Sequence, residues 1–370
     1  MRIGIDARMY GPKQGGLGRY IEQLIKHLEK TDTQNEYVVF LRKENFEEFK
    51  SQNANFKKVL TDVHWYGLNE QIKMPDIIKK EEIDLMHFPH WNVPFFYNKP
   101  FIVTIHDLLL LHYPTKDAST LGPVSYWFKN LAFKKILHHA VNKARKIIAP
   151  SEFTKRDICK TLNIPLEKII VTYLAPMDSP VSAGTSVQKY NIAKPYALYV
   201  GVAYPHKNLE KLIRAWKIFE EKYGNNYQLV LVGKENFFYN RLINSTNYKK
   251  CKNILYTGYL NDAELAQIYS KASLYVFPSL YEGFGMPPLE AMQNGVPVMS
   301  SNSTCLPEIL GNGADYFDPN DEIIMADSIH KGFTDQNLRS SLISNSKSVL
   351  SRYSWEKTAR ETLAIYKGNT

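Results

Sequence analysis

Glu282-Gly-Phe-Gly-Met-Pro-Pro-Leu-Glu290 is the stretch that says most about the architecture of this chain of 370 residues. It follows a short apolar run, residues 274–278, which is typical of a buried parallel strand. Pro287 and Pro288 favour the first turn of a helix, because that turn needs no N–H donors from them. We expect the helix to end at Gly295. The stretch therefore predicts a strand, a loop and a helix in succession, as in parallel α/β sheets.

The same stretch combines two carboxylates with a glycine-rich loop. Gly283 and Gly285 let the backbone turn tightly and approach a ligand, and amides at a helix N-terminus attract anions. Glu282 and Glu290 add acceptors for hydroxyl groups, so a ligand with both hydroxyls and phosphates, such as a nucleotide-sugar, fits the combination. Each glutamate alone has a simpler interpretation, as a solvated loop residue or as a favourable charge near a helix N-terminus.

The stretch also resembles a family motif. Residues 277–287 and 290–298 are similar to the Glu-x7-Glu signature of the retaining glycosyltransferases of family four, whose fold is called GT-B. The resemblance implies that Glu282 contacts sugar hydroxyls near the reacting centre. It also implies that Glu290 accepts hydrogen bonds from the ribose of the donor. The loop residues that would bind the donor are Gly283, Phe284 and Gly285.

Apolar runs of strand length alternate with amphipathic helical stretches twice along the chain, which predicts parallel sheets. We therefore predict an α/β protein of the GT-B type, with two Rossmann-like domains facing each other across a cleft. Residues 1–180 would form the acceptor-binding domain and 190–353 the donor-binding domain, joined by a linker within 177–194. The resemblance implies that a terminal helix in 354–370 packs back on the first domain. The expected strands are 2–7, 37–41, 58–61, 85–88, 101–106, 146–150, 169–173, 196–200, 228–232, 254–257, 274–277, 297–300 and 315–317.

Composition and charge narrow the class of protein. The net charge of +9 favours polyanionic partners, but no nucleic-acid module accompanies it, so we expect no nucleic-acid partner. Cys159, Cys251 and Cys305 are too widely spaced for a zinc site or a disulfide framework. The N-terminus runs straight into a strand without signal-peptide features, and no apolar run reaches the roughly eighteen residues of a membrane span. We expect a cytoplasmic protein.

Residues 127–146, WFKNLAFKKILHHAVNKARK, are basic and contain no acidic side chain. Aromatic and aliphatic residues recur there at roughly helical spacing, with lysines between them. A basic, aromatic helix of this kind can lie on an anionic membrane surface, which would make the protein peripheral at the inner face of a membrane. The alternative is a helix that faces the core and exposes a solvated basic side.

Gly15-Gly-Leu-Gly-Arg-Tyr20 follows the first predicted strand and opens a helix. It fails the dinucleotide pattern, because Ile21 stands where the third glycine should be, counted from Gly16. Residues 41–43 also lack the acid that binds ribose in such enzymes, so we expect no nicotinamide or flavin. The segment resembles the Gly-Gly loop of family four, which implies that Gly15 and Gly16 approach the diphosphate and sugar. A tight turn without a binding role is the alternative.

Two further segments match the family at predicted strand ends, where open α/β sheets place ligands. His106 begins a His-Asp element, and the resemblance implies that it contacts the donor sugar. Lys207 follows the first strand of the second domain, where a lysine can neutralise phosphate as a compact charge. This chain has His206 where the family often has arginine, so His206, Arg19 or helix amides would meet the remaining phosphate charge. Lys207 as a solvated lysine is the alternative, and the histidines have no partners at metal-ligand spacing.

These motifs together predict a retaining glycosyltransferase that moves a hexose from a nucleotide-diphosphate sugar to a glycan or lipid-linked acceptor in surface polysaccharide synthesis. The catalytic residues would be His106, Lys207 and Glu282, and no metal or other cofactor is expected. Residues 104–114 and 204–208 resemble the mannosyltransferase-like subgroup, which favours GDP-mannose. The alternatives are a UDP-sugar donor, a nucleotide-sugar epimerase or hydrolase on the same scaffold, and a non-catalytic protein that binds nucleotides or glycans.

Overall fold

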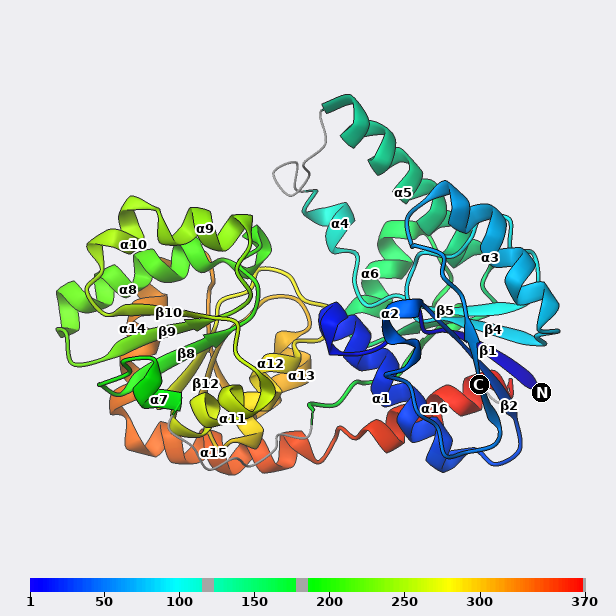
Figure 1. Cartoon of the computed structure of the whole chain (residues 1–370). Coiled ribbons are helices and arrows are strands. Elements are labelled where there is room, and N and C mark those ends of the chain that lie inside the picture. Colours follow the sequence, from blue (N-terminus) through cyan, green and yellow to red (C-terminus); the bar gives the residue numbers. More distant parts are fainter. Residues whose placement is uncertain (115–122, 178–185, 369–370) are drawn as a thin grey trace. The chain divides into compact units, whose positions relative to one another are not determined.

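The computed structural model describes residues 1–114, 123–177 and 186–368, which fold into two compact units (Figure 1). Part of the predicted linker, residues 178–185, lies outside the described residues. Unit 1 comprises Met1–Leu108, Ser119–Leu174 and Ser354–Thr370, and unit 2 comprises Leu109–Ala118 and Ala175–Tyr353.

Unit 1 is built on a seven-stranded parallel sheet in the order β3-β2-β1-β4-β5-β6-β7. Its central strands are almost wholly apolar and buried, because helices cover both faces of a parallel sheet. The strand order reverses between β1 and β4, and α/β folds bind ligands beyond the carboxyl ends of strands at such a switch point. The strands are β1 (Arg2–Asp6), β2 (Glu36–Leu41), β3 (Phe56–Leu60), β4 (Leu85–Phe88), β5 (Phe101–Thr104), β6 (Ile147–Ala149) and β7 (Ile169–Val171).

The C-terminal helix α16 (Trp355–Tyr366) belongs to unit 1 and packs against α1 (Gly15–Thr31) (Figure 1). Ser354 caps α16 through a hydrogen bond from the Lys357 amide, as its sequence predicts. At its other end the Tyr366 hydroxyl lies 2.7 Å from Nδ1 of the buried His87 in β4. The other helices of this part of the chain are α2 (Lys43–Phe46), α3 (Leu68–Lys80), α5 (Pro123–Lys143) and α6 (Glu152–Leu162).

Unit 2 repeats the plan with a six-stranded parallel sheet in the order β10-β9-β8-β11-β12-β13, whose switch point lies between β8 and β11. Helix α14 packs against α8, and α15 packs against α12. The strands are β8 (Tyr196–Val200), β9 (Gln228–Val232), β10 (Ile254–Gly258), β11 (Leu274–Phe277), β12 (Val298–Ser301) and β13 (Ala314–Phe317). The helices are α4 (Leu109–His112), α7 (Ser186–Lys189), α8 (Leu209–Tyr223), α9 (Phe237–Ile243), α10 (Thr246–Lys250), α11 (Asp262–Lys271), α12 (Met286–Gln293), α13 (Leu306–Leu310), α14 (Glu322–Thr334) and α15 (Gln336–Leu350).

The predicted α/β class with two parallel-sheet, Rossmann-like domains is confirmed, and every expected strand is present within a few residues of its predicted bounds. The basic stretch is helical in α5, but its apolar residues divide. Leu137 and Val141 in the second half are buried, whereas Trp127 and Phe128 are exposed by 59% and 60%. A helix that buries its whole apolar face in the core is therefore excluded for the first half of α5.

Candidate functional site

A half-buried ion pair lies at the switch point of unit 2. Nζ of Lys207 is 2.6 Å from Oε1 of Glu282, and the two side chains are only 17% and 12% exposed. Lys207 ends the short 3-10 helix after β8, and Glu282 lies on the loop between β11 and α12. Two residues that the sequence singles out 75 positions apart are thus in direct contact. Because both side chains are largely shielded from solvent, each charge acts on the other more strongly than at an open surface.

The loops that carry this pair are held by hydrogen bonds between side chains and the backbone. Asn208 adopts a left-handed conformation with φ 63°, and its Nδ2 donates to the carbonyls of Pro278 and Pro319 at 3.1 and 2.8 Å. On the other side, the Glu282 amide donates to Oγ1 of Thr304 at 3.1 Å. Asparagine tolerates positive φ better than most residues, so it suits this junction. The ion pair is therefore preorganised by the loops that follow β8 and β11.

His206, one candidate for the remaining phosphate charge, is a buried and neutral side chain in the structure. Its side chain is buried, and burial, followed by the neighbouring Lys207, lowers the pKa of its imidazole to about 3. The imidazole is therefore neutral near pH 7. Its ring stacks on Tyr204 with centroids 6.0 Å apart, and its carbonyl accepts a hydrogen bond from the Leu280 amide at 2.8 Å. The structure gives His206 a role in positioning the loop.

Gly285 is the position of the glycine loop where only glycine fits. Its φ is 89°, and an added Cβ would lie 2.8 Å from Cδ2 of Leu306. Gly285 is also the N-cap of α12, whose first turn contains Pro287 and Pro288. The two prolines have no N–H, so the predicted anion site at this helix has fewer amides than an ordinary N-terminus.

Two other predicted donor-binding residues are fixed by aromatic side chains. The ring of Phe284 is buried and meets Tyr353 edge-on, with centroids 5.6 Å apart, so only its backbone can reach a ligand. Glu290, in α12, accepts a hydrogen bond from the Tyr269 hydroxyl at 3.2 Å. Burial raises the pKa of Tyr269, which keeps this hydroxyl protonated as a donor. Glu290 is thus oriented by a neutral partner.

His106 follows β5 in unit 1. Its Nε2 lies 3.0 Å from the Pro89 carbonyl, so Nε2 carries the proton and Nδ1 is the acceptor nitrogen. Its ring meets Tyr20 edge-on at a centroid distance of 4.7 Å. Burial lowers the pKa of His106 to about 4, although the hydrogen bond to Pro89 opposes the shift. His106 is therefore a neutral, oriented imidazole near pH 7.

The predicted Gly-Gly segment opens a helix, as expected, and forms its first turn. Gly15 and Gly16 begin α1, and Gly15 has a φ of 64°. The position with no room for a side chain is Gly18, where an added Cβ would lie 2.0 Å from the Gly11 carbonyl oxygen. Gly18 is therefore packed against the backbone of the loop before α1.

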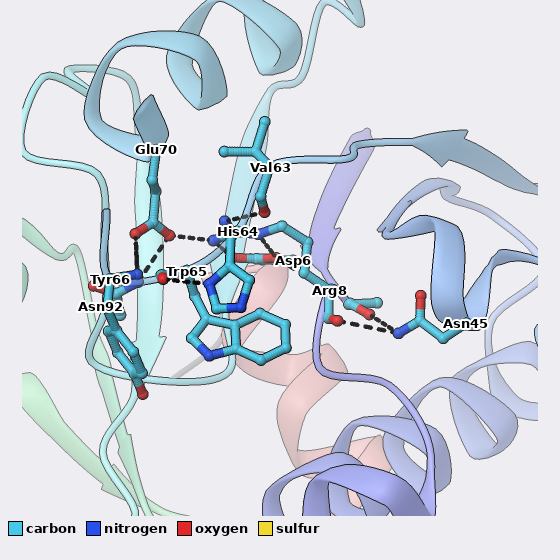
Figure 2. A network of polar contacts seen from close by, with 10 residues as sticks. Asp6, Arg8, Asn45, Val63, His64, Trp65, Tyr66, Glu70 and Asn92 are labelled. Carbon is cyan, nitrogen blue, oxygen red and sulfur yellow. Dashed lines mark hydrogen bonds and ion pairs between the residues drawn. The ribbon is translucent and has the colours of Figure 1, made fainter. Parts of the chain in front are cut away.

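A polar network at the carboxyl end of β1 was not predicted from the sequence (Figure 2). Arg8, only 3% exposed, pairs with Asp6 at 2.7 Å and with the fully buried Glu70 at 2.5 Å. Asn92 donates to both carboxylate oxygens of Glu70, at 2.7 and 2.8 Å. The network's signal in the sequence is the pair of charged residues Asp6 and Arg8 at the end of the first apolar strand.

Family models cover most of the chain. Residues 14–175 match the model for Glycosyltransferase Family 4, and residues 185–349 match that for Glycosyl transferases group 1. The chain belongs to glycosyltransferase family 4. The enzyme class predicted from the sequence is thereby confirmed.

Named relatives of this glycosyltransferase include two bacterial enzymes. It is 28% identical to O-antigen chain mannosyltransferase B of Escherichia coli, over 95% of this chain and 96% of the relative. It is also 28% identical to O-antigen chain mannosyltransferase RfbU of Salmonella typhimurium, over 73% and 70%. Among solved structures it resembles the sucrose-phosphate synthase from Thermosynechococcus elongatus, with a TM-score of 0.74 and 18% identity over 100% of this chain and 98% of that one. This structural likeness establishes the fold.

Two features are absent from residues 1–114, 123–177 and 186–368. No helix there is long and apolar enough to cross a membrane. In the same ranges, no three His, Cys, Asp or Glu side chains are grouped as ligands of a metal ion would be.

Proposed function

We propose that this glycosyltransferase transfers mannose from GDP-mannose, with retention of configuration and without a metal ion, to a growing surface glycan or lipid-linked oligosaccharide. The relatives named as O-antigen mannosyltransferases support the sugar and the acceptor class. The observation that carries the proposal is the Lys207–Glu282 pair, which joins a cation suited to a diphosphate to a carboxylate suited to sugar hydroxyls.

In this proposal Lys207 stabilises the charge that develops on the departing diphosphate, as preorganised charges generally do in catalysis. Its ammonium has three N–H groups, so it can hold Glu282 and a phosphate oxygen together. Glu282 accepts hydrogen bonds from the sugar. Its negative charge is already compensated by Lys207 at 2.6 Å, which makes it a weak nucleophile. We therefore propose that Glu282 positions the sugar and does not attack it.

The remaining roles follow from the family resemblance and stay proposals. Glu290, oriented by Tyr269, would accept hydrogen bonds from the donor ribose. Gly15 and Gly16 would offer the first-turn amides of α1 to the donor. His106, neutral and with Nδ1 as an acceptor, would bind a sugar hydroxyl.

The first half of α5 supports a peripheral location at an anionic membrane. Trp127, Phe128 and Leu131 are exposed by 59%, 60% and 39%, and the nearby Lys134 and Lys135 are exposed as well. Exposed aromatic and basic side chains on one helix fit the headgroup region of anionic lipids. Co-sedimentation with phosphatidylglycerol vesicles tests this, with phosphatidylcholine vesicles as the control. Equal or absent binding to both would refute it.

The donor proposal is tested with a panel of GDP-, UDP- and ADP-sugars, in which release of the nucleoside diphosphate is measured with and without acceptor extract. GDP-mannose should give the fastest release, and NMR of the product should show an α-linkage. EDTA should leave the rate unchanged. Faster turnover of a UDP-sugar would refute the donor, an inverted product would refute retention, and loss of activity in EDTA restored by Mg²⁺ would refute metal independence. No release from any sugar would refute the transfer itself.

A further inference from the structure

We propose that the C-terminal helix α16 positions His106 for sugar transfer, through Tyr20 of α1 and a network of buried hydrogen bonds. The inference rests on the proposed function, in which His106 binds a hydroxyl of the donor sugar. Tyr20 is a positioning residue, because it acts through the histidine. All the side chains that link α16 to His106 belong to unit 1.

His106 is held on two sides. Its Nε2 lies 3.0 Å from the Pro89 carbonyl, and its ring meets that of Tyr20 at an angle of 81°, with centroids 4.7 Å apart. The hydrogen bond fixes the position of Nε2 but still allows the imidazole to rock about that atom. The Tyr20 ring restricts this rocking, because edge-to-face contacts between aromatic rings are directional. The direction of Nδ1, the nitrogen proposed to bind the sugar hydroxyl, therefore depends on Tyr20.

Tyr20 is itself fixed by the His87 network, which consists of Tyr20, Thr104, His87 and Tyr366. The Tyr20 hydroxyl lies 3.2 Å from Oγ1 of Thr104, at the end of β5. The same Oγ1 lies 2.9 Å from Nε2 of His87, whose Nδ1 lies 2.7 Å from the Tyr366 hydroxyl. All four side chains are at most 4% exposed, so water cannot replace a hydrogen bond that is lost.

The neutral state of His87 makes the network cooperative. Burial lowers the pKa of His87 to about 3, so its imidazole carries a single N–H near pH 7. His87 therefore donates one of its two hydrogen bonds and accepts the other. If Tyr366 donates to Nδ1, then Nε2 donates to Thr104, and in the opposite arrangement Thr104 donates and Tyr366 accepts. A change at either end thus alters the hydrogen bonds of the other members.

Both ends of α16 bear on Tyr20. Trp355, the first residue of the helix, is buried, and its ring centroid lies 6.2 Å from that of Tyr20. Tyr366, the last residue of the helix, closes the His87 network. A buried network in which each member has a partner makes its surroundings rigid. We infer that α16 contributes to the geometry at His106 as well as to stability.

Variants of the full chain test the proposal. Thr104→Val keeps the shape of the side chain and removes the central hydroxyl, and Tyr20→Leu removes the ring against His106. Tyr196→Phe is the matched control, because it also removes a buried tyrosine hydroxyl, which donates to the Ile268 carbonyl at 2.6 Å at the amino end of β8. Each change is made in the wild type and in His106→Ala. Turnover is measured at saturating GDP-mannose with acceptor extract, and the His106 ring is followed by NMR of histidine labelled with ¹³C at Cε1.

We expect turnover to fall at least about tenfold in Tyr20→Leu and about three- to tenfold in Thr104→Val, since a small misplacement at the reacting centre costs a large factor in rate. In His106→Ala the same changes should lower turnover no further, because they act through the histidine. The His106 signal should shift or broaden in both variants. Tyr196→Phe should leave turnover and the His106 signal unchanged, and Thr104→Ser, which keeps the hydroxyl, should restore both.

A His106 signal that is unchanged in Tyr20→Leu and Thr104→Val would overturn the proposal. An equal loss of turnover in His106→Ala would overturn it too, because a merely structural role would act without the histidine. If Thr104→Val does not fold, Tyr366→Phe tests the same network from its other end. Absence of nucleotide-sugar turnover in the wild type would refute the proposed function, and the His106 signal would still decide whether Tyr20 orients the ring.

Discussion

Replacing Glu282 by glutamine should separate nucleotide binding from sugar transfer, because it removes the carboxylate and releases Lys207 from the ion pair. In the free protein Lys207 is held by Glu282 at 2.6 Å. At an effective dielectric constant of about 20, the attraction at that distance is roughly 6 kcal/mol, and desolvation of both groups offsets most of it. A net coupling of about 1–2 kcal/mol between Lys207 and Glu282 remains. A bound diphosphate must therefore share Lys207 with Glu282.

Glu282→Gln removes this competition, so the nucleoside diphosphate should bind about three- to tenfold more tightly than to the wild type. Turnover should fall about 10- to 100-fold or more, because the carboxylate that accepts hydrogen bonds from the sugar is lost. Isothermal titration with GDP, UDP and ADP gives the first quantity, and the release assay gives the second. A variant that binds nucleotide more tightly and turns over more slowly is not explained by general damage to the fold.

Two controls make the result specific. Lys207→Gln should weaken nucleotide binding, and adding Glu282→Gln to it should give no further tightening, because the two residues act as a coupled pair. Asp327→Asn breaks an exposed ion pair with Lys222, 2.8 Å apart on the surface of the same unit, and should leave binding unchanged. If Glu282→Gln binds nucleotide as weakly as Lys207→Gln, the proposed competition for Lys207 is wrong.

Three further predictions concern stability. Gly285→Ala should lower the free energy of unfolding by about 1–3 kcal/mol, since φ is 89° and the new Cβ meets Leu306 at 2.8 Å; an unchanged urea midpoint would contradict it. Tyr366→Phe should cost about 1–3 kcal/mol, because it leaves Nδ1 of the buried His87 without its partner, and urea unfolding of the variant beside the wild type measures the loss. Burial lowers the pKa values of His87 and His106 from 6.5 to about 3 and about 4, so the unfolded chain binds more protons below pH 6.5. Stability should therefore fall as pH drops from about 6.5 towards 4, by up to roughly 1.4 kcal/mol per pH unit for each histidine, and a urea midpoint that is flat between pH 7 and 5 would rule this out.

The elements of the fold were predictable because their signals are local. Apolar runs mark the strands, and the prolines and Gly295 mark the ends of α12, which spans Met286–Gln293. The sequence placed Lys207 and Glu282 each just beyond a strand of one parallel sheet, so both were expected at the same edge of it. Their direct contact was not predicted and comes from the structure. The topology of a parallel sheet thus predicts that residues far apart in sequence lie at the same edge.

Burial is what the sequence could not supply. The motif gives His206 as a replacement for arginine, yet only the folded structure shows that it is enclosed and neutral. The pairing of Arg8 with Glu70 joins residues 62 positions apart and depends on how the loop before α3 folds over β1. Likewise the exposure of Trp127 depends on where α5 leaves the rest of unit 1, which helical periodicity alone does not determine.

The two switch points differ in the kind of cation that they use, and this difference leads to a last prediction. Arg8 is 3% exposed and holds Asp6 through two nitrogens, a planar arrangement suited to a permanent contact. Lys207 makes one contact to Glu282 and keeps other N–H directions for a phosphate. Lys207→Arg preserves the positive charge, but its guanidinium should bind both carboxylate oxygens of Glu282. This bidentate contact should keep the arginine on Glu282, away from the phosphate, and slow transfer at least about tenfold. If activity of Lys207→Arg equals that of the wild type, charge alone explains this position, and the proposal that Lys207 must hold Glu282 and a phosphate together is refuted.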